Sequence, residues 1–294
     1  MNFQSRHFLE QHIADTLHFY APRAVDPEGG FFHYFLDDGT VYNTTHRHLV
    51  SATRFVFNGA MAKRHSGLDA VADWARHGIA HLEAFRRSDG LYAWTVDHGQ
   101  IEDATVMAYG QAFVLLAQAH AFSVGCATRQ DVEAAFARMN DAFFSAADGA
   151  YADEITPDGR LLDYRGQNAN MHMCEACLAA YEFTGEVRYL DRAEVLIERF
   201  AFDLADTAGG LVWEHYQADW SIDWDYNKNN PGNIFKPWGF QTGHQTEWAK
   251  LLMIVHQHRP QTRWVDRAAE LQMAAFRWGW DAQHGGLMYG FAPD

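Results

Sequence analysis

The chain has 294 residues, of which 48% are hydrophobic and 21% are charged, so it holds enough apolar material for a large core. Its formal net charge of −15 disfavours nucleic acids and anionic membranes as partners. No apolar run approaches the roughly 20 residues of a membrane span, and the first residues lack a charged and then apolar signal pattern. We therefore expect a cytoplasmic globular protein.

The three cysteines form no even-numbered disulfide framework. Cys174 and Cys177 are spaced as C-x-x-C, which is compatible with a redox pair or half of a zinc site. However, they fall inside an apolar stretch from Met171 to Tyr181, and no second cysteine pair accompanies them. The pattern favours buried thiols that pack in a core, in a reducing compartment.

Helical periodicity of apolar residues recurs along the whole chain. In chain order it predicts helices over residues 3–20, 45–63, 68–87, 103–124, 129–146, 170–183, 187–203, 244–258 and 262–280. The helices that begin at Thr45, Asp103, Asn170 and His244 mix small, polar and apolar residues, and each follows a long loop. Their successors carry charged faces. We expect the first set to form an inner ring and the second set an outer ring.

A short connector of glycine followed by aromatic or aliphatic residues separates the helix pairs. It reads Gly29-Gly30-Phe31-Phe32, Asp89-Gly90-Leu91-Tyr92, Asp148-Gly149-Ala150-Tyr151, Gly209-Gly210-Leu211-Val212 and Gly285-Gly286-Leu287-Met288. Repeats of one helix pair and one connector, about sixty residues long, are typical of a helical toroid rather than of separate domains. The sequence therefore predicts an all-α fold, an (α/α)6 barrel, formed by one domain over residues 1–294.

The fifth connector lies at the end of the chain, so about nine of twelve helices are expected and the C-terminal part of the ring is expected to be missing. Apolar faces on the first and last helices would then be exposed at a cost. We expect either a fragment or a chain that borrows surface from a partner.

Two predicted inner helices open with the same spacing, His172-x-x-Glu175 and His244-x-x-Glu247. Residues three apart share a helix face, so each carboxylate can hold its histidine, or both groups can face a cavity. A carboxylate raises the pKa of a neighbouring histidine and fixes its tautomer, which suits a general base near neutral pH. A polar core that merely satisfies these histidines is the alternative.

Four further residues are candidates for the cavity rim. Arg54 lies in an otherwise apolar part of an inner helix, and a buried arginine needs an anionic or hydroxylated partner. Asn168 precedes His172 by one helical turn. Tyr109 and Trp238 offer flat faces for sugar rings, although the 10 tryptophans of the chain are equally suited to filling the core. H-x-x-E lacks the i, i+4 histidine pair of a zincin, so no metal site is predicted, and no nucleophile elbow or phosphate loop is present.

Three stretches carry a resemblance to a known family. They are Asn43-Thr44-Thr45-His46-Arg47-His48 followed by Arg54; Asn168-Ala169-Asn170-Met171-His172-Met173-Cys174-Glu175-Ala176; and Asn233-Ile234-Phe235-Lys236-Pro237-Trp238-Gly239-Phe240-Gln241-Thr242-Gly243-His244-Gln245-Thr246-Glu247-Trp248-Ala249-Lys250-Leu251-Leu252. The chain resembles the N-acylglucosamine 2-epimerase superfamily along its whole length. It is most similar to the aldose–ketose isomerase branch that acts on mannose or sulfoquinovose.

The resemblance implies an (α/α)6 barrel without metal or other cofactor that moves the C2 proton of an open-chain sugar through a cis-enediol. Return of the proton to C1 gives the ketose, and return to the other face of C2 gives the epimer. His244 would be one acid/base group, oriented by Glu247. Arg54 and His172 would polarise substrate oxygens, and Asn168 would bind a hydroxyl, with Tyr109, Trp238 and Glu175 completing the substrate-binding set.

The family's second acid/base histidine lies in the last inner helix, beyond the fifth connector. The chain ends at Asp294, before any such helix, and loss of one proton-transfer group costs roughly 10²–10⁴-fold, so impaired catalysis is expected.

Two other classes stay open. A glycoside hydrolase on the same toroid would use two of Asp103, Glu175 and Glu247, and a non-catalytic toroid would only bind sugar or protein. Which monosaccharide is the substrate, the choice between isomerase and epimerase, and a homodimer also stay open.

Overall fold

The computed structural model describes residues 2–65, 71 and 73–292, and helices form most of its regular structure. The chain divides into two compact units, residues 1–139 with 155–159 and residues 140–154 with 160–294.

The elements before Asn140 belong to the first unit, except that its last helix runs on into the second. They are α1 (Arg6–Tyr20), β1 (Tyr34–Phe35), β2 (Val41–Asn43), β3 (Arg47–His48), α2 (Leu49–His65), α3 (Trp74–His81) with a 3-10 turn (Leu82–Phe85), β4 (Thr95–Asp97), β5 (Gln100–Asp103), β6 (Val106–Met107), α4 (Ala108–Ser123) and α5 (Arg129–Phe143). β1 pairs with β2, and β3, β4 and β5 form a three-stranded antiparallel sheet. α2 packs against both α3 and α4.

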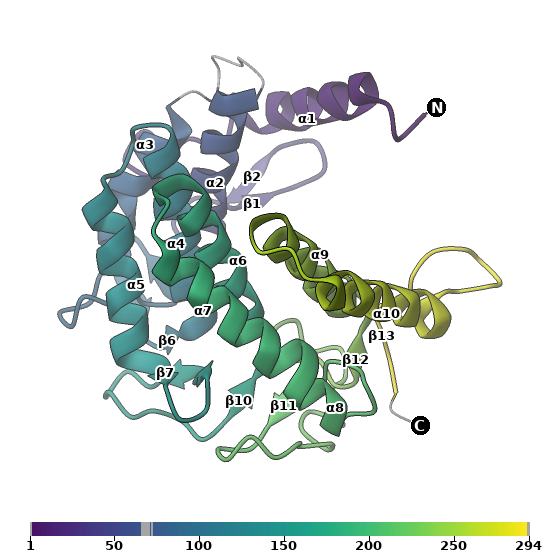
Figure 1. Ribbon diagram of the computed structural model, residues 1–294. Helices are drawn as coiled ribbons and strands as arrows, with labels where there is room; N and C mark the ends of the chain where they lie inside the picture. Colours follow the sequence, from purple (N-terminus) through teal and green to yellow (C-terminus); the bar gives the residue numbers. More distant parts are fainter. Residues whose placement is uncertain (1, 66–70, 72, 293–294) are drawn as a thin grey trace. The chain divides into compact units, whose positions relative to one another are not determined.

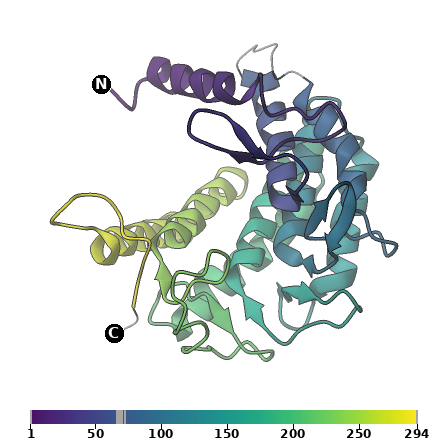
Figure 2. The ribbon, with the colours of Figure 1, turned by 180° about the vertical axis from the view of Figure 1, so that it is seen from behind.

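The later elements belong to the second unit, apart from the end of β9. They are β7 (Phe144–Ser145), β8 (Ala150–Tyr151), β9 (Glu154–Ile155), β10 (Arg165–Gly166), α6 (Gln167–Thr184), α7 (Val187–Ile197) with a π-helical turn (Glu198–Leu204), α8 (Ala205–Thr207), β11 (His215–Tyr216), β12 (Phe240–Gln241), α9 (Thr242–His258), α10 (Thr262–Gly279) and β13 (Gly290–Phe291). α9 and α10 run side by side as a hairpin in both views (Figures 1 and 2), α6 packs against α7, and α9 packs against α6.

Short antiparallel strand pairs fix the starts of the inner helices in the second unit. β10, directly before α6, pairs with β11 in the fourth connector region, and β12, directly before α9, pairs with β13 after the fifth connector. The connectors need glycine because Gly90, Gly149 and Gly210 adopt φ angles of 82°, 65° and 86°, a region that other residues enter at a cost.

The fourth residue of three inner helices is a buried amide that clamps the connector before it. Gln111 accepts from the backbone N–H of Tyr92 at 3.1 Å and donates to its C=O at 2.8 Å. Asn170 makes the same two bonds to Tyr151, at 2.8 and 3.0 Å, and Gln245 makes them to Val212, at 3.0 and 2.8 Å. These clamps put α4, α6 and α9 in one common register, which the unequal loop lengths conceal in the sequence.

The predicted helices correspond to observed ones, but two predicted starts are wrong. Thr45 instead lies in a bend before β3, and Asp103 is the last residue of β5 and is followed by β6, so α2 and α4 begin at Leu49 and Ala108. The cause is local: Asn43 accepts from the backbone N–H groups of Thr45 and His46, and Asp103 accepts from that of Thr105. Such side-chain bonds compete with the helix for the backbone.

Two other predicted helices also differ from the observed ones. The predicted helix over 68–87 includes residues 68–70 and 72, which lie outside the described residues, and its described helical part begins with α3 at Trp74. The predicted helix over 187–203 changes from α-helical to π-helical winding after Ile197.

Cys174 and Cys177 are fully buried in α6 and are not disulfide-bonded, so their packing role is confirmed. Among the helices that the structure describes, none has the length and apolar character needed to cross a bilayer.

Candidate functional site

The candidate site of the second unit is built on the N-terminal halves of α6 and α9. His172 Nδ1 lies 3.1 Å from Glu175 Oε2, one turn further along α6. From α9, Lys250 donates to the other oxygen of Glu175 at 2.8 Å. Burial alone would raise the pKa of Glu175, but the hydrogen bonds and charges of His172 and Lys250 outweigh it and lower that pKa to about 2. Glu175 is therefore ionised at neutral pH and fixes His172.

The second histidine has a carboxylate partner, but the sequence predicted the wrong one. His244 Nδ1 lies 2.9 Å from both oxygens of Glu214, which comes from the fourth connector region, whereas Glu247 was expected to orient it. Glu247 contributes only through its charge. Three residues along a helix bring two side chains to one face, but they do not make one point at the other's ring nitrogen.

Electrostatics at His244 favour its protonated form. Burial acts to lower the pKa of His244, but the charge and hydrogen bond of Glu214, aided by the charge of Glu247, raise it above its ordinary value of 6.5. The carboxylate of Glu214 is itself buried, with 2% of the side chain exposed. A buried carboxylate needs hydrogen-bond donors, and here a histidine and an amide provide them.

A second expectation is wrong once the inner helices are aligned by their buried amide clamps. The two H-x-x-E motifs were expected at matching repeat positions, but His244 is the third residue of α9 and His172 the sixth of α6. The sixth positions of the four inner helices are instead occupied by Arg54, Phe113, His172 and Glu247. The matching motifs were a coincidence of spacing, although one common position does carry three of the predicted site residues.

Two other predicted residues of the second unit differ in their remaining hydrogen-bonding capacity. Asn168, on the first turn of α6, has a side-chain oxygen that is buried without a hydrogen-bond partner. Its free acceptor is suited to a hydroxyl group of a ligand. Trp238 already donates its indole N–H to the carbonyl oxygen of Trp224 at 2.7 Å, and Lys228 Nζ lies 5.6 Å from the centre of its ring, so at most the other ring face is open to a ligand.

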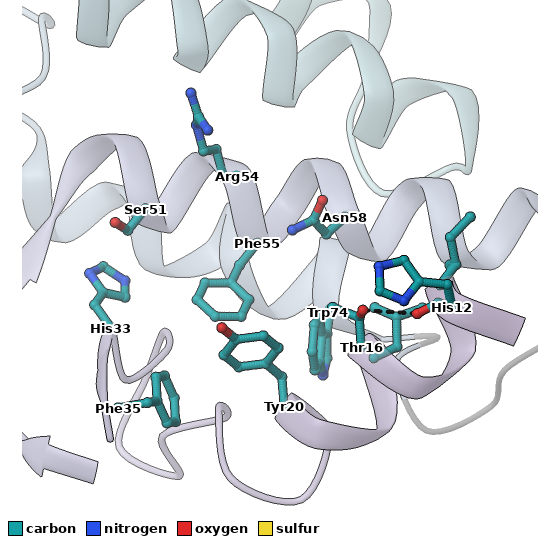
Figure 3. Close-up of a pocket in the computed structure, with 12 residues that line it drawn as sticks. His12, Thr16, Tyr20, His33, Phe35, Ser51, Arg54, Phe55, Asn58 and Trp74 are labelled. Atoms are coloured by element: carbon teal, nitrogen blue, oxygen red, sulfur yellow. Dashed lines mark hydrogen bonds between the residues drawn. The ribbon is translucent and has the colours of Figure 1, made fainter. Parts of the chain in front are cut away.

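The remaining predicted residues, Arg54 and Tyr109, belong to the first unit. Arg54 was expected to be buried, and that expectation is wrong: its side chain is exposed, with the guanidinium 4.7 Å from the centre of the Phe113 ring. It borders a cavity of about 410 Å³ between α1 and α2, and Figure 3 shows it pointing away from the aromatic rings of Tyr20 and Phe55. Tyr109 packs against Phe113, with ring centres 5.0 Å apart.

Sequence reasoning missed Glu214, Gln167 and Lys250. A signal for Glu214 existed, because it stands four residues after Gly210 and Asp153 stands four residues after Gly149. Asp153 is also buried and accepts from the backbone N–H of Gly166 at the start of α6, at 2.6 Å. An acid at this connector position lies beside the start of the next inner helix. No group of three metal-ligating side chains was found among the described residues.

Two inner helices of the second unit each carry a histidine that is held by a carboxylate, an arrangement suited to acid/base chemistry. The family model that describes N-acylglucosamine 2-epimerase matches residues 30–294. The chain belongs to this family, and its fold class is the helical toroid predicted from the repeat.

Individual relatives are more specific. A D-mannose isomerase of Marinomonas mediterranea is 46% identical over 296 residues, which cover 99% of this chain and 75% of that protein. A crystal structure of D-mannose isomerase superposes with a TM-score of 0.97 at 45% identity, over 100% of this chain and 76% of that one. A cellobiose 2-epimerase from Bacillus thermoamylovorans superposes with a TM-score of 0.80 at 17% identity over 96% of this chain and 76% of that one, a likeness of fold alone.

Proposed function

We propose that the protein is a sugar isomerase that interconverts D-mannose and its ketose, fructose, by proton transfer between C2 and C1. The observation that carries the proposal is the buried His244–Glu214 pair, together with 46% identity to a D-mannose isomerase. A histidine whose pKa is raised above 6.5 is matched to a proton that must be both removed and returned near neutral pH.

The chemistry requires one base that faces C2 and C1 of the open-chain aldose. His244 takes the proton from C2, the C2–H electron pair forms the C1=C2 bond, and the carbonyl oxygen at C1 accepts a proton to give the cis-enediol. Loss of the hydroxyl proton at O2 forms the new C2 carbonyl, and His244 returns its proton to C1. No net proton is gained or lost: His244 can serve both steps at carbon, whereas a second group must give a proton to O1 and take one from O2.

The other predicted residues act on the oxygen atoms of the sugar rather than on C1 and C2. His172, held by ionised Glu175, exchanges protons with the substrate oxygens, while the free oxygen of Asn168 accepts from a hydroxyl and Trp238 offers its ring face. Glu247 adds negative charge beside His244. The predicted role of Arg54 in stabilising enediolate charge and that of Tyr109 in binding sugar stay predictions, as do the single barrel domain, a cytoplasmic location and a homodimer.

The glycosidase alternative is disfavoured by the same contacts. A general acid for glycoside cleavage needs a carboxyl that stays protonated near neutral pH. Glu175 has a pKa of about 2, so it is ionised near neutral pH and is not suited to donate a proton to a leaving group.

The function is tested by proton NMR of D-mannose incubated with the full chain in D2O. We expect fructose to appear, with deuterium at C1 where the base exchanges with solvent. His244→Asn keeps a nitrogen near Glu214 but removes the base, so the rate should fall roughly 10²–10⁴-fold.

Glu182→Gln is the control for a general effect of altering a histidine–carboxylate pair, because it removes the charge from an exposed carboxylate that contacts His258. Its rate should equal that of the unmodified chain. The role of His244 is wrong if His244→Asn retains full activity. Epimerisation rather than isomerisation is shown if glucose accumulates without fructose.

A further inference from the structure

Glu214 is held in place from two directions. Its oxygens lie 2.9 Å from His244 Nδ1, and Oε2 also accepts from the side-chain amide of Gln167 at 2.9 Å. The backbone carbonyl of Glu214 accepts from the backbone N–H of Gln167, the first residue of α6, at 3.2 Å. The carboxylate is therefore attached to α6 by both backbone and side chain.

The orientation of the Gln167 amide is itself fixed. Trp248, fully buried on α9, donates its indole N–H to Gln167 Oε1 at 2.7 Å. An indole N–H can only donate, so the oxygen of the amide must face Trp248 and its nitrogen must face Glu214 and His244. The amide nitrogen lies 2.8 Å from His244 Nδ1.

This arrangement selects one tautomer of His244. A carboxylate such as that of Glu214 only accepts hydrogen bonds, so Nδ1, 2.9 Å from both of its oxygens, carries the hydrogen and the lone pair of the neutral ring lies on Nε2. Without the carboxylate, Gln167 becomes the nearest donor to Nδ1. The hydrogen would then move to Nε2 and the ring would no longer offer a base there.

We propose that Glu214 is a positioning residue that keeps His244 in the Nδ1-protonated form with Nε2 as the proton-accepting nitrogen, and that Gln167 and Trp248 aim Glu214 at it. The catalytic consequence rests on the proposed isomerase function, whereas the tautomer itself does not. The raised pKa of His244 is consistent with this arrangement.

Other charged and titratable groups lie near Glu214 and His244. Glu247 acts on His244 from α9 itself. Tyr164, Tyr216 and Tyr289 lie near Glu214, and their pKa values are raised by burial and by neighbouring charges that include Glu214. These phenols stay neutral near pH 7, and the charges that act on His244 are those of Glu214 and Glu247. His215 also interacts with Glu214, but burial lowers the pKa of His215.

The test is NMR of the full chain labelled with ¹⁵N-histidine, with the His244 signals assigned by their loss in His244→Asn. In the unmodified chain we expect the Nδ1-protonated tautomer and a pKa above that of an ordinary histidine. Glu214→Gln should lower the His244 pKa and shift the ring toward the Nε2-protonated form, while Glu214→Asp restores the original state in part. Glu182→Gln should change neither.

Activity supplies a second readout. For D-mannose, Glu214→Gln should lower kcat roughly 10²–10⁴-fold with little change in KM, as expected when a catalytic histidine loses its orienting carboxylate. The acid limb of the residual activity should move to lower pH, because the base is then neutral at lower pH.

The proposal is overturned if Glu214→Gln folds normally and leaves the His244 tautomer and pKa unchanged, whatever its activity. If the unmodified chain converts no sugar but the His244 signals respond to Glu214 as described, the isomerase function fails and the positioning role stands.

Discussion

At the scale of single residues, Glu175 links the site to the stability of the fold. Its pKa of about 2 in the folded chain lies below its ordinary value of 4.5, because His172 and Lys250 favour its ionised form against the cost of burial. A carboxyl group whose pKa is lowered by folding adds stability above its unfolded pKa, and this stability is lost as pH falls through the folded value. The contribution is thus complete above about pH 5 and disappears between about pH 4.5 and 2.

We expect Glu175→Gln to lower the free energy of unfolding by about 1–3 kcal/mol at pH 7. The difference from the unmodified chain should shrink as the pH is reduced to about 3, which urea unfolding at several pH values would measure. Glu182→Gln, at an exposed carboxylate, provides the control. A difference that is independent of pH would show that Glu175 acts through packing rather than through charge.

Local pairs could be predicted from the sequence, and distant partners could not. His172 and Glu175 are three residues apart on one helix, so helical geometry places them on one face, where they are in contact. Glu214 is thirty residues from His244, and Lys250 is seventy-five residues from Glu175. Their contacts depend on how the connector folds back and how α6 packs on α9, which no local spacing encodes.

At the scale of elements, the amide clamps explain why the inner helices share one register. Each clamp satisfies both backbone groups of a connector residue that the core covers. The periodicity of apolar residues identified the helices, because burial of one face is a sum over many side chains. Their first turns were misplaced where Asn43 and Asp103 bind nearby backbone groups instead, an effect of single side chains.

We predict that Asn170→Ala destabilises the chain by about 2–4 kcal/mol, because two buried backbone groups of Tyr151 lose their partners at about 1–3 kcal/mol each. Urea unfolding would measure the loss. Gln100→Ala removes an exposed amide that bonds only locally to Gly99 and should change stability little. If both variants were equally stable, the clamps would be a consequence of the fold rather than a cause of its register.

At the scale of the whole molecule, the sequence predicted the fold class because the repeat is a global signal. The same connector recurs five times with two helices between copies, so an error at any one boundary does not change the architecture. The site was less predictable, since the register of each inner helix decides which side chains share a position. His172 and Glu247 occupy that common position only because α6 and α9 begin at Gln167 and Thr242.

Net charge leads to a prediction for the whole chain. With 38 acidic and 23 basic residues, like charges repel one another in the folded state, and salt weakens this repulsion as the Debye length falls from about 30 Å at 0.01 M to about 8 Å at 0.15 M. Salt also weakens favourable pairs, such as those of Arg259 with Asp191 and Glu194 on α7. Surface pairs contribute about 0–1 kcal/mol each, so the repulsion due to the net charge of −15 should decide whether salt stabilises or destabilises the folded chain.

We therefore expect the unfolding temperature at pH 7.5 to rise by about 2 °C over this range of salt, because about 1 kcal/mol shifts it by about 2–4 °C in chains of 150–250 residues and by less in longer ones. Differential scanning calorimetry measures it directly. The same experiment near the isoelectric point of about 5.5 is the control, because the net repulsion is absent there and the rise should vanish. A fall in unfolding temperature at pH 7.5 would mean that the specific ion pairs outweigh the overall negative charge.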